Sequence, residues 1–354
     1  MLSLKHTFIV CCLVLASLPA LADHPSLGIN NGYGGAIVGQ SATTLPEGAF
    51  SFSIKQEYIE NNTFSDRKLG EFGEAGQDVH SVESLDVINL NAAWGFSKKL
   101  TLGLSLPVIS RNNISQAPHH HEEEEHHDDD DDDEYHEEGS PSVDALGDSS
   151  GIGDLTAYGQ YQFFSSADNR RLAAIYFGVK LPTGKTDQKT DQGETFEAEH
   201  QPGSGSVDGL LGLSYSQRLN RWSLDSSIFA SLATEGTQDT DLGNALNYDL
   251  ALSHPLMATG ESHSHHNHHH SPSLITAATI VFELNGEWRD KVDVDGTTQA
   301  HTGGNLVYLT AGVRVNFGRQ WSATLSGGIP VVENLNGQQS DPNWRGGLVL
   351  SRSF

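Results

Sequence analysis

The sequence predicts an all-β protein: a transmembrane, antiparallel, up-and-down β-barrel of the bacterial outer-membrane type, with about twelve strands. Three observations lead to this prediction. The chain begins with an export signal, its apolar residues recur with a period of two, and its connections alternate between short and long. The last stretch, 344–354, also ends on an aromatic residue after placing Trp344, Leu348 and Leu350 on one side. A soluble β-sandwich is the alternative for this stretch taken alone.

Residues 1–22 form a secretory signal peptide. Lys5 supplies the positive charge, residues 7–18 the apolar run, and Ala20-Leu21-Ala22 the cleavage site. Both cysteines, Cys11 and Cys12, lie inside the signal, so the mature chain has neither disulfides nor thiolate metal sites. No later run of eighteen apolar residues predicts a spanning helix.

The alternation predicts strands along most of the mature chain. Residues 23–48 are glycine-rich and aperiodic, and we expect a periplasmic N-terminal segment there. Residues 49–354 form the predicted barrel, and the cleanest alternation is that of Leu100, Leu102, Leu104, Leu106 and Val108. The expected strands are 49–58, 86–96, 100–108, 151–163, 173–181, 207–215, 222–232, 246–253, 274–284, 307–317, 321–329 and 344–354.

The lengths of the connections assign the two sides of the membrane. Short turns follow the second, fourth, sixth and tenth strands, and polar loops follow the odd-numbered strands. Outer-membrane barrels have short periplasmic turns and longer external loops, and an even strand count leaves both termini in the periplasm. The chain is therefore predicted to lie in the bacterial outer membrane, with membrane lipid as its first partner.

Composition supports the same class. The 37 glycines and modest hydrophobicity suit a wall in which only alternate residues meet lipid. The net charge of −26 excludes nucleic acid as a partner, because phosphates need lysine and arginine.

The loop 110–150, expected outside the cell and without regular structure, contains a first histidine tract. Its segment 119–138 holds six histidines and thirteen carboxylates. Imidazole beside carboxylate favours Zn²⁺, Ni²⁺ or Cu²⁺, and the aspartate run 128–133 also suits loosely held Ca²⁺. The other interpretation is a solvated low-complexity loop. The candidate metal ligands are His119, His120, His121, His126, His127 and His136.

The connection 257–273 contains a second histidine tract, which carries almost no charge. It is the one long connection on the predicted periplasmic side. Short histidine-rich tracts favour metal binding, and a polar linker is the alternative. The candidate ligands are His263, His265, His266, His268, His269 and His270. No obligatory cofactor is expected.

Charged residues within the strands predict a polar lumen. A charge on the lipid face would cost about 2–4 kcal/mol for Arg or Lys near the midplane. An acidic lumen favours cations, but the same residues also suit bracing of a narrow interior. The residues expected to point inward are Asp86, Lys180, Asp208, Asp225 and Asp249.

Four short motifs resemble the outer-membrane proteins of the family "Putative MetA-pathway of phenol degradation". They are Leu45-Pro46-Glu47-Gly48, the stretch 102–107, Gly151-Ile152-Gly153-Asp154-Leu155 and Leu181-Pro182-Thr183-Gly184. The resemblance covers most of the mature chain and implies a transport role for aromatic compounds. The histidine tracts are not part of it.

The sequence contains no complete motif of an enzyme. Gly184-Lys185-Thr186 lacks the glycine that a phosphate-binding loop needs five residues earlier, where Val179 stands, and no catalytic Ser, His and acid grouping stands out. We therefore expect no enzyme, but an outer-membrane channel or transporter that handles divalent transition-metal cations through its histidine-rich loops. The alternatives are a channel for small hydrophobic or aromatic compounds and a non-conducting metal-binding barrel. Oligomeric state stays open.

Overall fold

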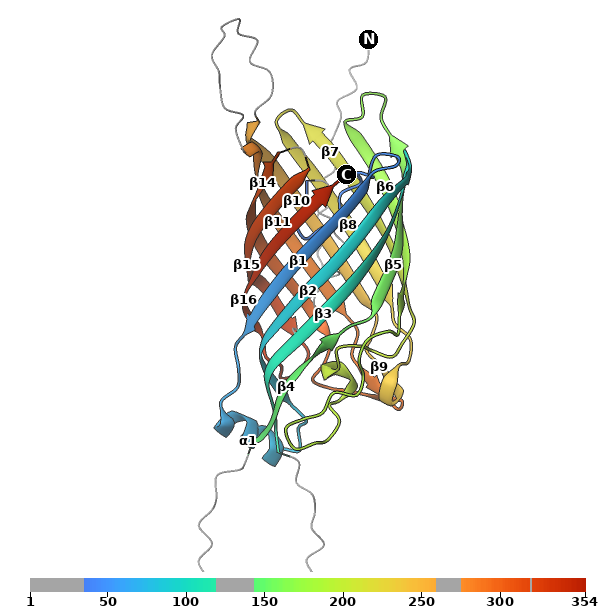
Figure 1. Cartoon of the computed structure of the whole chain (residues 1–354). Helices are drawn as coiled ribbons and strands as arrows, with labels where there is room; N and C mark the ends of the chain where they lie inside the picture. Colours follow the sequence, from blue (N-terminus) through green and yellow to red (C-terminus); the bar gives the residue numbers. More distant parts are fainter. Residues whose placement is uncertain (1–34, 119–142, 259–274, 319) are drawn as a thin grey trace, which may run out of the picture.

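The computed structural model describes residues 35–118, 143–258, 275–318 and 320–354 (Figure 1). Its main sheet closes on itself as a ring in which every neighbouring pair is antiparallel, as predicted. The wall strands are β1 (Phe50–Asn61), β2 (His80–Ser97), β3 (Leu100–Gln116), β5 (Leu155–Ser165), β6 (Arg171–Leu181), β7 (Asp208–Leu219), β8 (Trp222–Leu232), β10 (Ala245–Ala258), β11 (Ile275–Arg289), β14 (Gly304–Phe317), β15 (Trp321–Leu335) and β16 (Pro342–Ser353).

The ring closes where β1 pairs with β16. Ser51 lies opposite Ser353, and Ile54 opposite Leu350. Closure gives every backbone group in the wall a partner, which a bilayer requires because it offers no water. One further strand, β4 (Asp144–Ile152), pairs only with β3 and extends the wall at one end.

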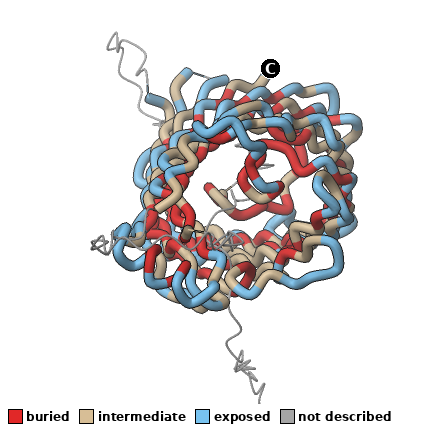
Figure 2. Tube along the Cα trace, turned by 90° about the horizontal axis from the view of Figure 1, so that it is seen from below, coloured by how far each residue is buried: buried red, intermediate tan, exposed pale blue. Residues whose placement is uncertain are grey.

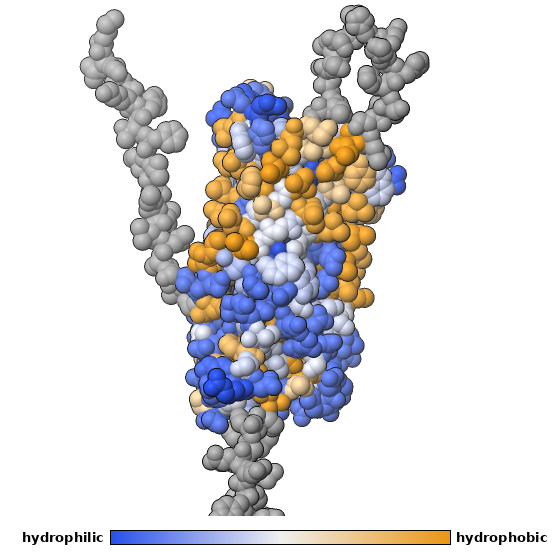
Figure 3. All heavy atoms as spheres, turned by 90° about the vertical axis from the view of Figure 1, so that its left-hand side faces the viewer, coloured by the Kyte–Doolittle hydropathy of each residue, from blue (hydrophilic) through white to orange (hydrophobic). Residues whose placement is uncertain are grey.

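The outer surface carries an apolar belt. Figure 3 shows hydrophobic residues over the part of the barrel near the C-terminal end and hydrophilic residues at the other end. Aromatic side chains meet in pairs in this belt, as in the girdles of outer-membrane barrels. Phe50 stacks on Trp94 with ring centroids 6.0 Å apart, and the last residue, Phe354, meets Phe52 at the same distance.

None of the helices in the described ranges has the length and apolar character that a membrane-spanning helix needs.

The strands rise beyond the apolar belt on the side opposite the C-terminus, which the topology makes extracellular. β2 and β3 have 18 and 17 residues, more than the 9–11 that cross a bilayer. The exposed apolar residues of β2 begin at Ile88, so residues 80–85 of that strand lie outside the belt. The helix α1 (Asp66–Glu74) precedes β2 and buries Leu69 and Phe72 against Val79.

Two predictions about external loops need correction. The loop 110–150 was expected to be irregular throughout, but β3 continues to Gln116 and β4 begins at Asp144, because the two segments pair with each other. The polar loop after β1 contains α1. Short elements also form in other external loops: η1 (Ala198–His200), η2 (Thr237–Asp239), and a small sheet of β9 (Thr240–Asp241), β12 (Asp293–Val294) and β13 (Thr297–Thr298).

The segment 23–48 was predicted to be a periplasmic N-terminal segment that leads into the barrel. The structure instead places residues 35–45 inside the ring, where Figure 2 shows a mostly buried segment within the circle of strands, and only residues 46–48 are exposed. Small residues make this possible: a Cβ added to Gly39 would lie 2.7 Å from the Cβ of Asp249. The Pro46–Gly48 turn, with Gly48 at φ 81°, then leads the chain into β1.

The direction of the charged side chains agrees with prediction except at Asp86. Lys180, Asp208, Asp225 and Asp249 lie on the inner face. Asp86 has the same parity as Ile88, so it lies on the outer face, where it accepts a hydrogen bond from Gln56 Nε2 at 3.1 Å. Its position at the edge of the apolar belt keeps this carboxylate near water.

Because the outer face is apolar, we expect a charged side chain placed on it to destabilise the barrel. Leu325 of β15 is 68% exposed and lies between Val313 and Leu348 of the neighbouring strands. We expect Leu325→Arg to destabilise the folded barrel by about 2–4 kcal/mol in lipid vesicles, because the guanidinium would enter hydrocarbon. Urea unfolding followed by heat-modifiable migration measures this change. Thr297→Arg, in the exposed external strand β13, is the matched control, and equal loss in both variants would contradict the membrane position.

Candidate functional site

Luminal side chains hold the N-terminal segment by its backbone. The carboxylate of Glu283 on β11 accepts hydrogen bonds from the N–H groups of Ile37, Val38 (2.9 Å) and Gly39 (3.3 Å). On the next strand, Arg314 Nη2 donates to the carbonyl of Ala36 at 2.6 Å. A buried acid and a buried base thus satisfy backbone groups that would otherwise lack partners in the lumen.

Later residues of the segment form hydrogen bonds with β3, β5 and β6 on the other side of the barrel. Gln160 Nε2 and the Tyr176 hydroxyl both donate to the carbonyl of Ser41, at 2.8 and 2.9 Å. Leu45 N–H donates to Thr101 Oγ1 at 2.8 Å. The segment therefore crosses the lumen and narrows it.

An aromatic cluster lines the lumen beside Ser41. It consists of Tyr158 (β5), Tyr176 (β6) and Phe229 (β8), all at least 95% buried. The rings of Tyr176 and Phe229 meet at 4.8 Å. The Tyr158 hydroxyl is buried and makes no hydrogen bond within the part of the chain that the structure describes. An unpaired buried hydroxyl is costly, and a polar group of a bound solute would satisfy it.

Glycines on the neighbouring strands make room for the ring of Tyr158. Gly103 on β3 and Gly178 on β6 flank Tyr158, and a Cβ at Gly103 would lie 2.4 Å from the tyrosine ring. An apolar groove on the membrane side runs over the same glycines and is bordered by Phe52, Trp94 and others.

External loops enclose a polar cavity of about 370 Å³ at the extracellular end. Its lining comes from five connections and includes the carboxylates of Asp78, Glu197 and Glu199, with His80 and His301. The loop between β6 and β7 reaches this cavity because Phe196, 1% exposed, packs against Val82 and Ile114 in the extended part of the wall.

Asp154 anchors the same loop. Its carboxylate accepts hydrogen bonds from the N–H groups of Gly184 and Ser204, both at 2.8 Å, and lies 3.6 Å from Lys180 Nζ. The Gly-Ile-Gly-Asp and Leu-Pro-Thr-Gly motifs of the sequence therefore meet at one point, where they turn the β6–β7 loop into the mouth of the barrel.

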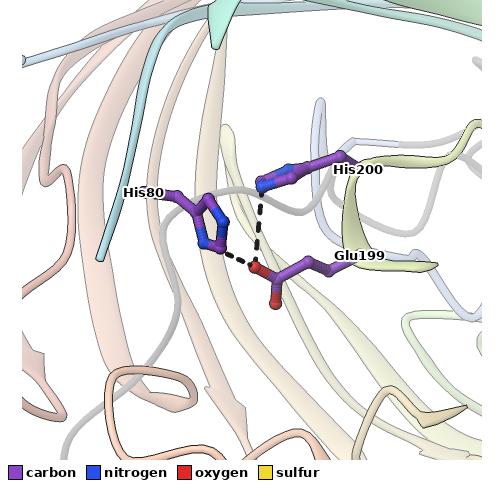
Figure 4. Close-up of side chains that lie close together, drawn as sticks. All are labelled: His80, Glu199 and His200. Carbon is purple, nitrogen blue, oxygen red and sulfur yellow. Dashed lines mark ion pairs between the residues drawn. The ribbon is translucent and has the colours of Figure 1, made fainter. Parts of the chain in front are cut away.

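Three potential metal ligands meet beside this cavity (Figure 4): His80, the first residue of β2, with Glu199 and His200 of η1. Glu199 Oε1 lies 3.3 Å from His80 Nδ1 and 3.6 Å from His200 Nε2. The two imidazole rings meet nearly edge to face, with centroids 4.7 Å apart. Sequence reasoning missed these residues; the adjacent acids and histidine in 197–200 were the available signal, but His80 is far away in the chain.

The two histidines, which both lie outside the apolar belt, have very different pKa values because their charged neighbours differ. Burial alone would lower the pKa of His80, but the hydrogen bond to Glu199 and the charges of Glu197, Glu199 and Asp78 raise it to about 10. Burial and the positive charge of His80 lower the pKa of His200 to about 3. One imidazole is therefore held charged and its neighbour neutral.

All predicted metal ligands, His119, His120, His121, His126, His127, His136, His263, His265, His266, His268, His269 and His270, lie outside the described residues. The strands that flank the two tracts end on opposite rims: β3 and β4 at the extracellular end, β10 and β11 at the end near the C-terminus. Metal binding by the tracts stays a prediction.

Comparison with known proteins gives a family match and several structural similarities. The family model described as "Putative MetA-pathway of phenol degradation" matches residues 130–334, more than half of the chain. No curated protein matches. The COG4313 outer membrane channel from Pseudomonas putida F1 has a TM-score of 0.57 at 15% identity, with 90% of this chain and 100% of that chain covered. This similarity establishes the shared fold.

Two other barrels are more distant. The β domain of the Bordetella autotransporter BrkA has a TM-score of 0.41 at 10% identity, covering 88% of this chain and 100% of its own. A Pseudomonas aeruginosa FadL homologue has a TM-score of 0.37 at 9% identity, covering 96% and 99%. Neither similarity supports an inference about function.

Release of the N-terminal segment should widen the lumen. Glu283→Gln removes the charge that holds three N–H groups, and hydrogen bonds to charged groups contribute about 1.5–3 kcal/mol each. We expect higher single-channel conductance in planar bilayers. Glu287→Gln is the control, because that luminal carboxylate of the same strand pairs with Arg289 at 3.0 Å. Unchanged conductance in Glu283→Gln would show that the segment stays in place without this carboxylate.

The raised pKa of His80 predicts a pH dependence. Because the folded pKa of about 10 exceeds the ordinary 6.5, the stabilisation is fully present below pH 6.5 and is lost as pH rises through about 10. Imidazole ¹⁵N NMR in metal-free buffer should show His80 protonated at pH 8, with the resonance identified by its loss in His80→Gln. Glu199→Gln should lower this pKa, whereas Glu71→Gln, an exposed carboxylate of α1, should not. An unshifted pKa in Glu199→Gln would contradict the assigned cause.

Proposed function

Because the chain belongs to the family "Putative MetA-pathway of phenol degradation" and has the fold of an outer-membrane channel, we propose that it admits small hydrophobic or aromatic compounds through the outer membrane. The observation that carries the proposal is the luminal aromatic cluster of Tyr158, Tyr176 and Phe229. A buried aromatic surface stabilises apolar solutes by removing their surface from water and by ring contacts.

The free hydroxyl of Tyr158 adds chemical selectivity. It lies in the aromatic cluster without a hydrogen-bond partner in the described part of the chain. A solute with one hydroxyl on an aromatic ring would offer both a stacking surface and that partner. Phenolic compounds combine these features, so they are the solute class that the cluster fits best.

The position of the cluster also suggests a path. Residues 35–45 narrow the axial route, and the aromatic cluster lies against the glycine-lined part of the wall next to the apolar groove. An apolar solute gains little from an aqueous route and much from a neighbouring hydrocarbon phase. This arrangement supports entry from the external mouth, binding at the aromatic cluster and exit through the glycine-lined wall toward the apolar groove on the membrane side.

Handling of transition-metal cations, the first expectation from the histidine tracts, has less support. The family description concerns an aromatic compound, and the tracts lie outside the described residues. That expectation stays a prediction, tested when Zn²⁺ uptake is measured beside that of phenol. The expectation that the chain is no enzyme likewise stays a prediction.

Uptake by cells tests the function. Cells that express the protein should accumulate labelled phenol and toluene faster than cells with an empty vector, whereas uptake of the polar sugar arabinose should differ much less. Equal phenol and toluene uptake with and without the protein would contradict the proposal.

Binding tests the role of Tyr158. Tyr158→Phe keeps the ring but removes the hydroxyl, so we expect phenol to bind roughly fivefold more weakly, since a neutral hydrogen bond contributes about 1 kcal/mol. Toluene should bind as before. Saturation-transfer NMR with the detergent-solubilised protein measures both. Tyr308→Phe is the control, because this second buried hydroxyl also has no partner among the described residues but lies under Arg345. A loss of phenol binding in Tyr308→Phe alone would place the solute elsewhere.

A further inference from the structure

His80, Glu199 and His200 have the separations of a metal site. One ligand atom from each side chain lies within 4.8 Å of the others, and Glu199 Oε1 is 3.3 Å and 3.6 Å from nitrogens of the two histidines. Nitrogen and oxygen ligands about 2.0–2.2 Å from one tetrahedral ion are separated by roughly 3.4 Å. Small rotations of the side chains would therefore bring all three to one ion.

The imidazole of His200 lacks the hydrogen bonds that burial demands. Its side chain is 2% exposed, and neither Nδ1 nor Nε2 makes a hydrogen bond within the described residues. A neutral histidine buried in this way leaves a nitrogen lone pair unsatisfied, which is unfavourable in a folded protein. The lone pair of a neutral imidazole is a ligand for transition-metal cations, and that of His200 has no other partner among the described residues.

Two neighbouring carboxylates lie where they could orient His80 as a metal ligand. His80 Nε2 lies 3.7 Å from Glu197 Oε2 and 3.8 Å from Asp78 Oδ1, so a metal at Nδ1 would leave Nε2–H facing two carboxylates. Histidine ligands commonly donate their second N–H to a carboxylate, which fixes the ring and raises its basicity.

The backbone of His200 is fixed separately. Ser149 Oγ donates to its carbonyl at 2.6 Å, and Arg111 Nη1 donates to the carbonyls of His200 and Gln201 at 3.5 and 3.3 Å. The histidine thus has a defined place on η1 that does not depend on a ligand.

We propose that His80, Glu199 and His200 bind one divalent transition-metal ion, with the remaining coordination position open to the 370 Å³ cavity. Two imidazoles and one carboxylate suit Zn²⁺, Co²⁺, Ni²⁺ or Cu²⁺ rather than Mg²⁺ or Ca²⁺, which prefer oxygen ligands. The ion would join the start of β2 to the β6–β7 loop and hold that loop against the wall.

The charge balance favours a cation. Asp78, Glu197 and Glu199 provide three carboxylates at the cluster, against the single fixed charge of Arg111. A divalent cation at the three ligand atoms would offset this negative charge. This site is independent of the histidine tracts and of the solute-binding cluster in the lumen.

Titration with Co²⁺ tests the proposal, using full-length protein in which the histidines of 119–136 and 263–270 are serine, so that those tracts offer no imidazole ligands. We expect one equivalent of Co²⁺, with the visible bands of a low-symmetry four- or five-coordinate ion, and displacement by Zn²⁺. Zn²⁺ should also raise the unfolding temperature, because the site exists only in the folded barrel.

The variants locate the ion. His200→Ala and the isosteric Glu199→Gln should abolish the bands, and Glu197→Gln should weaken binding about ten- to hundredfold through the loss of a group that orients His80. His254→Ala, at the opposite end of the barrel against Trp222, is the matched histidine control and should bind normally. Absence of Co²⁺ binding in the parent, or binding that survives both His200→Ala and Glu199→Gln, would overturn the proposal. Loss of the bands in His301→Ala would do the same, because it would place the ion across the cavity.

Discussion

Closure of the sheet is the constraint on which the rest of this structure depends. A strand in hydrocarbon must satisfy each N–H and C=O with another strand, so the first wall strand has to meet the last. The pairing of β1 with β16 does this over eleven residue pairs, from Ser51 to Asn61. Once the ring is closed, alternate residues face lipid and lumen, so the environment of most side chains follows from their parity, except at register shifts such as that between Gln162 and Phe164.

Closure also creates an interior that must be filled. Inward-facing polar residues such as Glu283 and Arg314 would be poorly satisfied in an empty narrow lumen, and the backbone of residues 35–48 supplies their partners. The same backbone needs partners because it forms no strand. The luminal side chains and the backbone of the segment thus satisfy each other's hydrogen bonds, so neither is buried without a partner. This explains why an aperiodic, glycine-rich segment has a defined place.

Beyond the membrane the barrel wall becomes a scaffold for loops. The extended parts of β2, β3 and β4 have an apolar inner face at Val82 and Ile114, and Phe196 of the β6–β7 loop packs into it. That packing brings His200 beside His80, although 119 residues separate them in the chain. A site that combines buried imidazoles and carboxylates therefore arises from ordinary apolar packing around it.

The sequence by itself determined the barrel, its strand count and the inward position of Lys180, Asp208, Asp225 and Asp249, because these depend on a local period of two. The same parity, applied to Asp86, would have placed that residue on the outer face. Only the tertiary structure decided where residues 35–48 lie, how β4 extends the wall, and that His80 meets Glu199 and His200. Those features depend on contacts between segments that are distant in the chain. Periodicity and composition do not predict which luminal carboxylate accepts a hydrogen bond from a given N–H group, or which loop packs against a given wall residue.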